Sequence, residues 1–183
     1  MRNGMLAGKL LVQAYLAYLL YVLAVTYDPG DVSFRPPFVL FVVDWVDLFI
    51  HEAGHMFFRI FGQVIYFAGG SLMQVLLPAV TAYFTWRNSR RWISLPLFWT
   101  GENLVNVSIY IKDAPYKKLH LIGKNLIHDW NWLLNGDPDV SEVLGMIISV
   151  LGLLVCTAGI VAGVWFAIER YREDLADNVR FDD

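Results

Sequence analysis

Five long apolar segments dominate this chain and restrict what it can fold into. They cover roughly residues 5–27, 37–61, 71–86, 92–111 and 140–168. A helix needs about 20 predominantly apolar residues to cross a bilayer, and the segments are close to that length. Hydrophobic residues make up 57% of the chain and charged residues only 17%, whereas about 25% of the residues of a soluble domain are charged. Backbone polar groups in lipid must be bonded within the protein, so segments of this kind predict helices.

We therefore expect an all-α integral membrane protein with about five transmembrane helices, forming one domain over residues 1–183 as a multi-pass protein of the cell membrane. The first segment begins like a signal peptide, but its apolar part is long and no small-residue cleavage motif follows, so we interpret it as a retained helix. Residues 62–70 have glycine at both ends of a β-prone stretch. This pattern favours a tight turn or a short re-entrant β element after the second helix. Lysines and arginines divide evenly between the two sides of such a topology, so they predict no orientation.

Composition also bears on the partners of the protein. The net charge is −3, without a basic excess, so nucleic acid is not an expected partner, whereas the lipid bilayer is. Cys156 is the single cysteine and lies in an apolar run. It is therefore expected to be a small buried residue that forms no intramolecular disulfide. The sequence does not specify an oligomeric state.

The pentapeptide His-Glu-Ala-Gly-His, residues 51–55, lies inside the second apolar segment and matches the pattern HExxH. On a helix His51 and His55 project from one face and can bind one metal ion. Glu52 lies beside them, where it can accept a proton from water. With this histidine and glutamate content, the expected number of chance matches is on the order of 0.002. Ionisable groups among apolar neighbours are costly, so the motif predicts a metal site rather than a pair of structural histidines.

A catalytic zinc ion usually has three protein ligands, so one more ligand must come from elsewhere. His128 and Asp129 precede an apolar aromatic stretch, residues 130–134. Either side chain can complete the site, although Asp129 can instead serve as a helix N-cap. His120 lies in a basic, amphipathic stretch and is the weaker candidate.

Further polar residues occur within the second and fourth segments. Asp47 precedes His51 by one helical turn and can accept the free ring N–H of a metal-bound histidine. Alternatively, Asp44 and Asp47 line a water-filled opening or pair with an arginine. Asn103 and Asn106 can donate to an oxyanion or hold a substrate backbone. Alternatively, they join helices through hydrogen bonds.

An HExxH motif inside a membrane helix resembles the site-2 protease family of intramembrane zinc metalloproteases. In that family an aspartate at the start of a later membrane helix is the third zinc ligand, and Asp129 matches it in order and context. The family also has an asparagine-bearing helix between its two metal motifs, which Asn103 or Asn106 matches. Residues 69–78 are similar to the region after the catalytic helix, where the family often has a re-entrant β element.

The resemblance covers roughly residues 37–135 and is to a divergent branch, because His128-Asp129-Trp130 stands where the family usually has Asp-Gly. It implies a zinc metalloprotease that hydrolyses peptide bonds in or near transmembrane segments of membrane-protein or peptide substrates. Zn²⁺ would be bound by His51 and His55 with Asp129, or with His128, and Glu52 would be the general base.

Two other classes of protein remain open. One is a membrane-embedded zinc-binding protein without protease activity, either a scaffold or a metal-ion carrier. The other is a structural membrane subunit in which the histidines form only internal hydrogen bonds. The candidate ligands gather near one point rather than along a path, which argues against a carrier.

Overall fold

The computed structural model describes residues 2–31, 33–119 and 127–181, and all regular structure within these ranges is helical. The helices are α1 (Arg2–Val25), α2 (Phe38–Phe58), α3 (Gln63–Ser89), α4 (Ser94–Asp113), the short α5 (Asp129–Leu133) and α6 (Pro138–Phe181), with 3₁₀ turns at Arg59–Phe61 and Arg90–Trp92. The predicted all-α class is therefore confirmed. The weaker ligand candidate, His120, lies outside the described residues.

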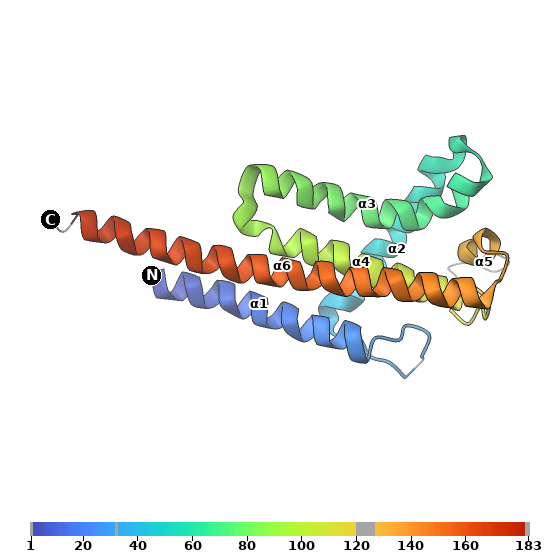
Figure 1. Ribbon diagram of the computed structural model, residues 1–183, viewed down its shortest axis with the longest axis horizontal. Coiled ribbons are helices and arrows are strands. Elements are labelled where there is room, and N and C mark those ends of the chain that lie inside the picture. The colour runs from blue at the N-terminus through green and yellow to red at the C-terminus, as the bar shows by residue number, and fades with distance from the viewer. Residues whose placement is uncertain (1, 32, 120–126, 182–183) are drawn as a thin grey trace.

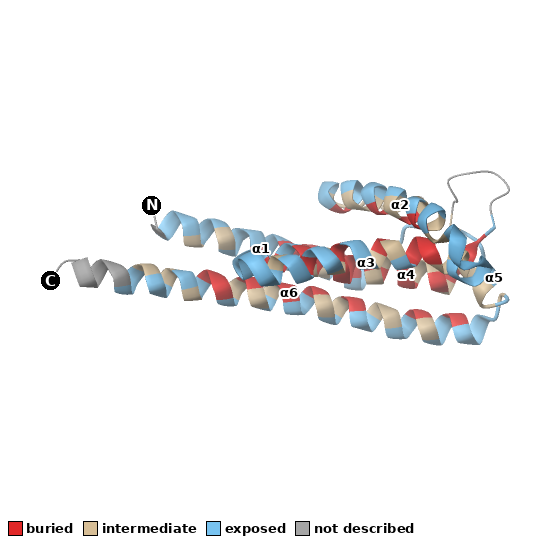
Figure 2. Cartoon of the chain, turned by 90° about the horizontal axis from the view of Figure 1, so that it is seen from above, coloured by how far each residue is buried: buried red, intermediate tan, exposed pale blue. Residues whose placement is uncertain are grey.

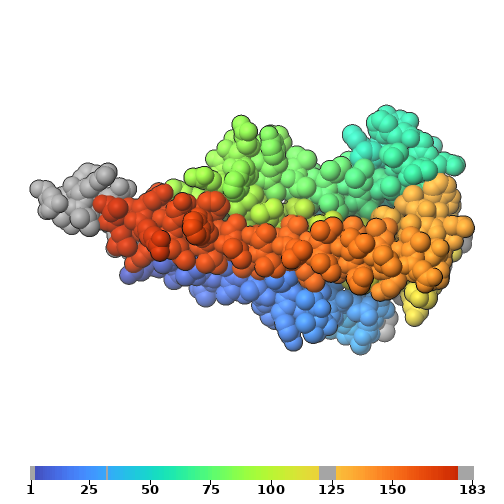
Figure 3. Space-filling view, in the orientation of Figure 1, coloured from blue at the N-terminus to red at the C-terminus, as the bar shows by residue number. Residues whose placement is uncertain are grey.

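Four long helices, α1, α3, α4 and α6, lie lengthwise beside one another, and α2 passes behind α4 from the side of α1 towards the start of α3 (Figure 1). Buried residues gather on α4, which packs against α6, α3 and α1 (Figure 2). On the face seen in Figure 3, α6 covers the middle of the molecule, with α3 along one side of it and α1 along the other. Helix α4 is thus the central element against which the others are arranged.

Three helical segments are long and apolar enough to cross a membrane, namely Asn3–Val25, Gln63–Trp92 and Pro138–Ala176. This composition is consistent with a membrane protein. The other two long helices, α2 and α4, are not among these segments. Three acidic residues, Asp44, Asp47 and Glu52, lie in α2.

The segment expected to form a turn or a re-entrant β element is helical in the structure. Gly62 adopts φ 91°, which a residue with a side chain rarely does, and it reverses the chain between the 3₁₀ turn and α3. Because this single residue makes the turn, α3 begins at Gln63 rather than near residue 71 and runs for 27 residues. Among the described residues there is no β-strand in this region or elsewhere.

Helices α4 and α6 approach each other along a seam of small residues that recur every seven positions on both helices. The pairs that face one another are Ser94 with Gly159, Gly101 with Gly152, and Ser108 with Gly145. A Cβ atom added at Gly152 would lie 2.6 Å from the carbonyl oxygen of Gly101. Small residues allow two helix backbones to come this close, and the contact fixes the position of α4.

Candidate metal centre

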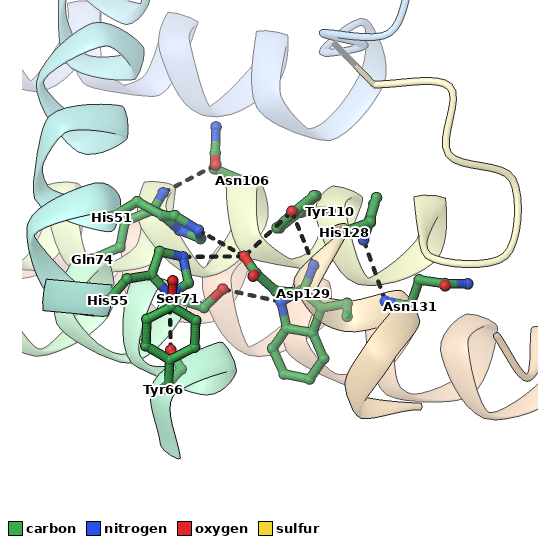
Figure 4. Close-up of polar contacts among 11 residues, drawn as sticks. His51, His55, Tyr66, Ser71, Gln74, Asn106, Tyr110, His128, Asp129 and Asn131 are labelled. Carbon is green, nitrogen blue, oxygen red and sulfur yellow. Dashed lines mark hydrogen bonds and ion pairs between the residues drawn. The ribbon is translucent and has the colours of Figure 1, made fainter. Parts of the chain in front are cut away.

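His51, His55 and Asp129 come together at one point, although they lie on two helices far apart in the sequence. The carboxylate oxygen Oδ2 of Asp129 is 3.1 Å from His51 Nε2 and 3.2 Å from His55 Nε2 (Figure 4). One nitrogen or oxygen atom from each of the three residues can be chosen so that all lie within 4.8 Å of one another. The group could therefore hold a metal ion.

The donor atoms fit a transition-metal ion of the size of zinc. Two ligands that are each about 2.1 Å from a tetrahedral ion lie about 3.4 Å apart, close to the observed separations of 3.1 and 3.2 Å. Two imidazole nitrogens with one carboxylate oxygen form a ligand set that suits zinc and other borderline metals. The two imidazole rings are inclined at 76° to each other, with centroids 4.8 Å apart.

Glycines on α3 make room for the site. Gly54 of α2 and Gly69 of α3 are in backbone contact, which brings the two helices close together. The next residue, Gly70, faces the ligand nitrogens. A Cβ atom at Gly70 would lie 2.6 Å from His55 Nε2 and closer still to His51 Nε2. The space beside both nitrogens is open only because Gly70 has no side chain.

We expect Gly70→Ala to weaken metal binding by at least about tenfold, because the added methyl group occupies the space next to both ligand nitrogens. Zinc affinity measured by competition with a chromophoric chelator checks this expectation. Gly8→Ala is the matched control, because a Cβ atom at Gly8 meets no other atom within 4 Å. Equal affinity in the two variants would contradict the proposed position of the ion.

Local structure around α5 presents Asp129 to the two histidines. His128 is the N-cap of α5, and its Nδ1 accepts a hydrogen bond from the backbone N–H of Asn131 at 3.3 Å. The hydroxyl of Tyr110 lies 3.3 Å from both the backbone nitrogen and the Oδ2 atom of Asp129. The indole N–H of Trp130 donates to Ser71 of α3 at 3.0 Å. Since His128 takes the capping role, the carboxylate of Asp129 is available as a ligand.

The surroundings of Asp129 and His128 favour the protonation state that each needs for its role as ligand or helix cap. Burial alone raises the pKa of Asp129, but its contacts with His51 and His55 outweigh burial and hold the pKa below its usual range. Asp129 is therefore ionised at neutral pH, as a ligand must be. Burial lowers the pKa of His128, although the charge of Asp113 opposes this change. A neutral His128 can accept the capping hydrogen bond.

The second ring nitrogen of each ligand histidine also has a partner. His51 Nδ1 lies 3.1 Å from Oε1 of Gln74, and His55 Nδ1 lies 2.8 Å from the carbonyl oxygen of Tyr66. Such contacts hold the ring and leave Nε2 for the metal. Sequence reasoning considered Asp47 for this role at His51, but its carboxylate accepts from the indole N–H of Trp99 at 2.8 Å.

The asparagines of α4 are not among the three converging ligands. Asn103 is fully buried and donates to the carbonyl oxygen of Trp99 and to Glu102. The side-chain oxygen of Asn106 accepts from Gln74, the partner of His51, at 3.0 Å. The hydrogen bonds of Asn103 thus lie within α4, whereas Asn106 joins α4 to α3 and is linked to the metal ligands through one intermediate residue.

Glu52 is half-buried beside the site. Its negative charge is near enough to act on both His55 and Tyr110. Within the ranges that the structure describes, no hydrogen bond or ion pair engages its carboxylate. Glu52 is therefore available to exchange protons with a molecule bound next to the histidines.

Sequence reasoning did not single out Tyr110, Tyr66 or Gly70 for roles at the site. Their positions depend on how α3 and α4 are rotated against α2, which no local pattern specifies. Gln74 carries one sequence signal, because a buried amide in an apolar helix requires a hydrogen-bonding partner.

Comparisons of the chain with protein-family models, curated proteins and solved structures gave no match.

Proposed function

We propose that the protein is an intramembrane zinc metalloprotease, a divergent relative of the site-2 proteases, that hydrolyses peptide bonds in or near transmembrane segments. One observation carries the proposal. The two histidines of an HExxH motif converge with Asp129, 78 residues from His51, and the carboxylate of Glu52 beside them forms no hydrogen bond or ion pair within the part of the chain that the structure describes. A purely structural histidine pair would not require the open space at Gly70.

In the proposed reaction the ion activates water and the protein transfers the proton. Zinc bound in such a site lowers the pKa of water to about 7 and stabilises negative charge on a carbonyl oxygen. Glu52 accepts a proton from the attacking water as the water oxygen bonds to the peptide carbonyl carbon. Glu52 then gives this proton to the amide nitrogen as the C–N bond breaks, so the immediate products are a carboxylic acid and an amine. The remaining proton of the acid then passes to the amine, which gives a carboxylate and an ammonium group. Asp129 and the two histidines would hold the ion.

We further propose that α2 and α4 lie at membrane depth, which would give five spans. Phe41, Trp45 and Phe49 form an exposed aromatic stripe at four-residue spacing on α2. Large apolar side chains on an outer helix face suit lipid or an apolar substrate segment. Polar residues of the two helices face each other: Trp99 of α4 donates to Asp47 of α2, and the amide nitrogen of Asn106 lies 3.5 Å from Asp44. A substrate helix would have to unwind locally, because its carbonyl groups are otherwise engaged in its own hydrogen bonds.

The proposal is tested with the purified protein in liposomes that contain the membrane proteins of its own host. The measurement is the number of new amino termini inside transmembrane segments, found by amine labelling and mass spectrometry. We expect these termini with zinc-loaded protein, their loss with the chelator 1,10-phenanthroline, and their return with excess zinc. The non-chelating isomer 1,7-phenanthroline is the control.

The same preparation separates the proposal from its alternative. Stoichiometric zinc without any new termini would identify a metal-binding protein that lacks protease activity. Protein that binds no zinc would leave only a structural role for the motif.

A further inference from the structure

A chain of hydrogen bonds leads away from the metal centre through three helices and ends at a carboxylate. His51 Nδ1 lies 3.1 Å from Oε1 of Gln74, whose amide nitrogen donates to Oδ1 of Asn106 at 3.0 Å. The amide nitrogen of Asn106 donates to the hydroxyl of Tyr27 at 2.9 Å, and this hydroxyl donates to Asp44 at 2.6 Å. Most of these groups are buried: Gln74 and Tyr27 are 4% and 8% exposed.

The carboxylate of Asp44 ends this chain of hydrogen bonds, and its chemistry determines which group donates in each bond. An ionised carboxylate only accepts hydrogen bonds, so Tyr27 donates to Asp44. The single hydroxyl proton of Tyr27 is then used, and its oxygen must accept from the amide nitrogen of Asn106. The amide oxygen of Asn106 accepts from Gln74, which turns the amide oxygen of Gln74 towards His51.

The orientation of Gln74 in turn determines which ring nitrogen of His51 carries the proton. A histidine facing an amide oxygen carries its proton on Nδ1, which leaves the Nε2 lone pair for a metal ion. If every bond ran the other way, Gln74 would present its N–H groups and His51 would carry its proton on Nε2, where the metal ion has to bind.

Burial disfavours the ionised form of Asp44, but two hydrogen-bond donors and an open pocket favour it. It lines an open pocket with a volume of about 350 Å³ beside Pro29, Phe34 and Trp45. Water in such a pocket can solvate the carboxylate oxygen that faces it. The amide nitrogen of Asn106, 3.5 Å from Asp44 Oδ1, also stabilises the negative charge.

We propose that Asp44 is a remote positioning residue for the metal centre: it orients the amides of Asn106 and Gln74, and through them it fixes the His51 tautomer that binds metal. This inference rests on the proposed metal site and adds to it a residue that touches neither the ion nor a ligand. Two non-titrating amides transmit the effect, so the chain conveys orientation and does not conduct protons.

The first test measures the tautomer without metal. Asp129 competes for a proton on His51 Nε2, so the comparison is made in the Asp129→Ala background. Histidines labelled with ¹⁵N are observed by NMR in micelles, and the His51 signals are assigned with His51→Gln. We expect the Nδ1–H tautomer to predominate when Asp44 is present. In Asp44→Asn, whose amide can donate as well as accept, we expect a mixture of the two tautomers.

A second variant separates orientation from simple structural damage. Adding Asn106→Asp to Asp44→Asn places an acceptor-only group two links closer to His51. This carboxylate accepts from Gln74 and again turns the amide oxygen of Gln74 towards the histidine, so the Nδ1–H tautomer should return. With Asp129 intact, we expect the zinc dissociation constant to rise about tenfold in Asp44→Asn. This is the lower end of the range seen when a hydrogen-bonding partner of a metal ligand is lost. In the double variant it should return to within about threefold of the parent value.

An unchanged tautomer ratio in Asp44→Asn would overturn the inference, and so would a double variant that is no better than the single one. The two proposals fail separately. A parent protein that binds no zinc would refute the metal centre, whereas the tautomer ratios would still decide the role of Asp44.

Discussion

Glu52→Gln should abolish proteolysis while zinc stays bound. Glutamine has almost the same size and shape as glutamate, but its amide cannot take a proton from water or return one to a leaving amine. Loss of general acid–base catalysis typically costs 10²- to 10⁴-fold in rate, so cleavage should fall by about that factor. Because Glu52 is not one of the three converging ligands, the zinc content should remain that of the parent. The measurements are new amino termini in host membrane proteins and metal content by mass spectrometry.

Glu142→Gln is the matched control for this experiment, since it makes the same chemical change on the exposed surface of α6. It should cleave as the parent does. If Glu52→Gln cleaves as fast as Glu142→Gln, the catalytic assignment is wrong even if zinc is present. If Glu52→Gln loses its zinc, Glu52 is a ligand and the proposed ligand set needs revision.

Asp129→Ala should remove zinc from the protein under conditions in which the parent retains it. Loss of an outer partner of a ligand already weakens metal binding about 10- to 100-fold, so loss of one of three ligands should exceed about 100-fold. The structure supports this size of effect, because Asp129 Oδ2 contacts Nε2 of both histidines. Zinc content and competition with a chelator of known affinity provide the measurement.

His128→Asn distinguishes the two adjacent ligand candidates. Asparagine is a good N-cap, so it preserves the contact that His128 makes with the backbone of Asn131 while removing the imidazole. Zinc affinity should stay close to that of the parent. Zinc retained in Asp129→Ala but lost in His128→Asn would reverse the assignment of the third ligand.

The helices could be predicted from sequence because apolar length is a local property. Each of the five predicted segments coincides with one of the long helices, although their ends differ. The largest difference is at the start of α3, where the β-prone residues 64–67 join the helix. This outcome depends on the backbone conformation of Gly62. The β propensity of the four residues is a weak preference that the surrounding structure overrides.

The site could be predicted only in part, for a similar reason. His51, Glu52 and His55 form a contiguous motif, so the sequence alone shows their shared helix face. Asp129 is distant in the sequence, and only a family resemblance favoured it over His128. The roles of Gln74 and Tyr110 depend on how three helices are rotated about their axes. The seam of small residues that sets this rotation for α4 is visible in the sequence as a seven-residue spacing, but its meaning requires both helices together.

The separation of the ligands along the chain gives a bound ion a second consequence. An ion held by His51, His55 and Asp129 would cross-link positions 78 residues apart, with the whole of α3 and α4 inside the closed loop. Clips that close long loops restrict the unfolded chain most strongly. A ligand that binds only the folded state, at a concentration 1,000 times its dissociation constant, adds about 4 kcal/mol to the free energy of unfolding. The ion would therefore hold α5 against the other helices, and a cell short of zinc would lose folded protein together with the proposed activity.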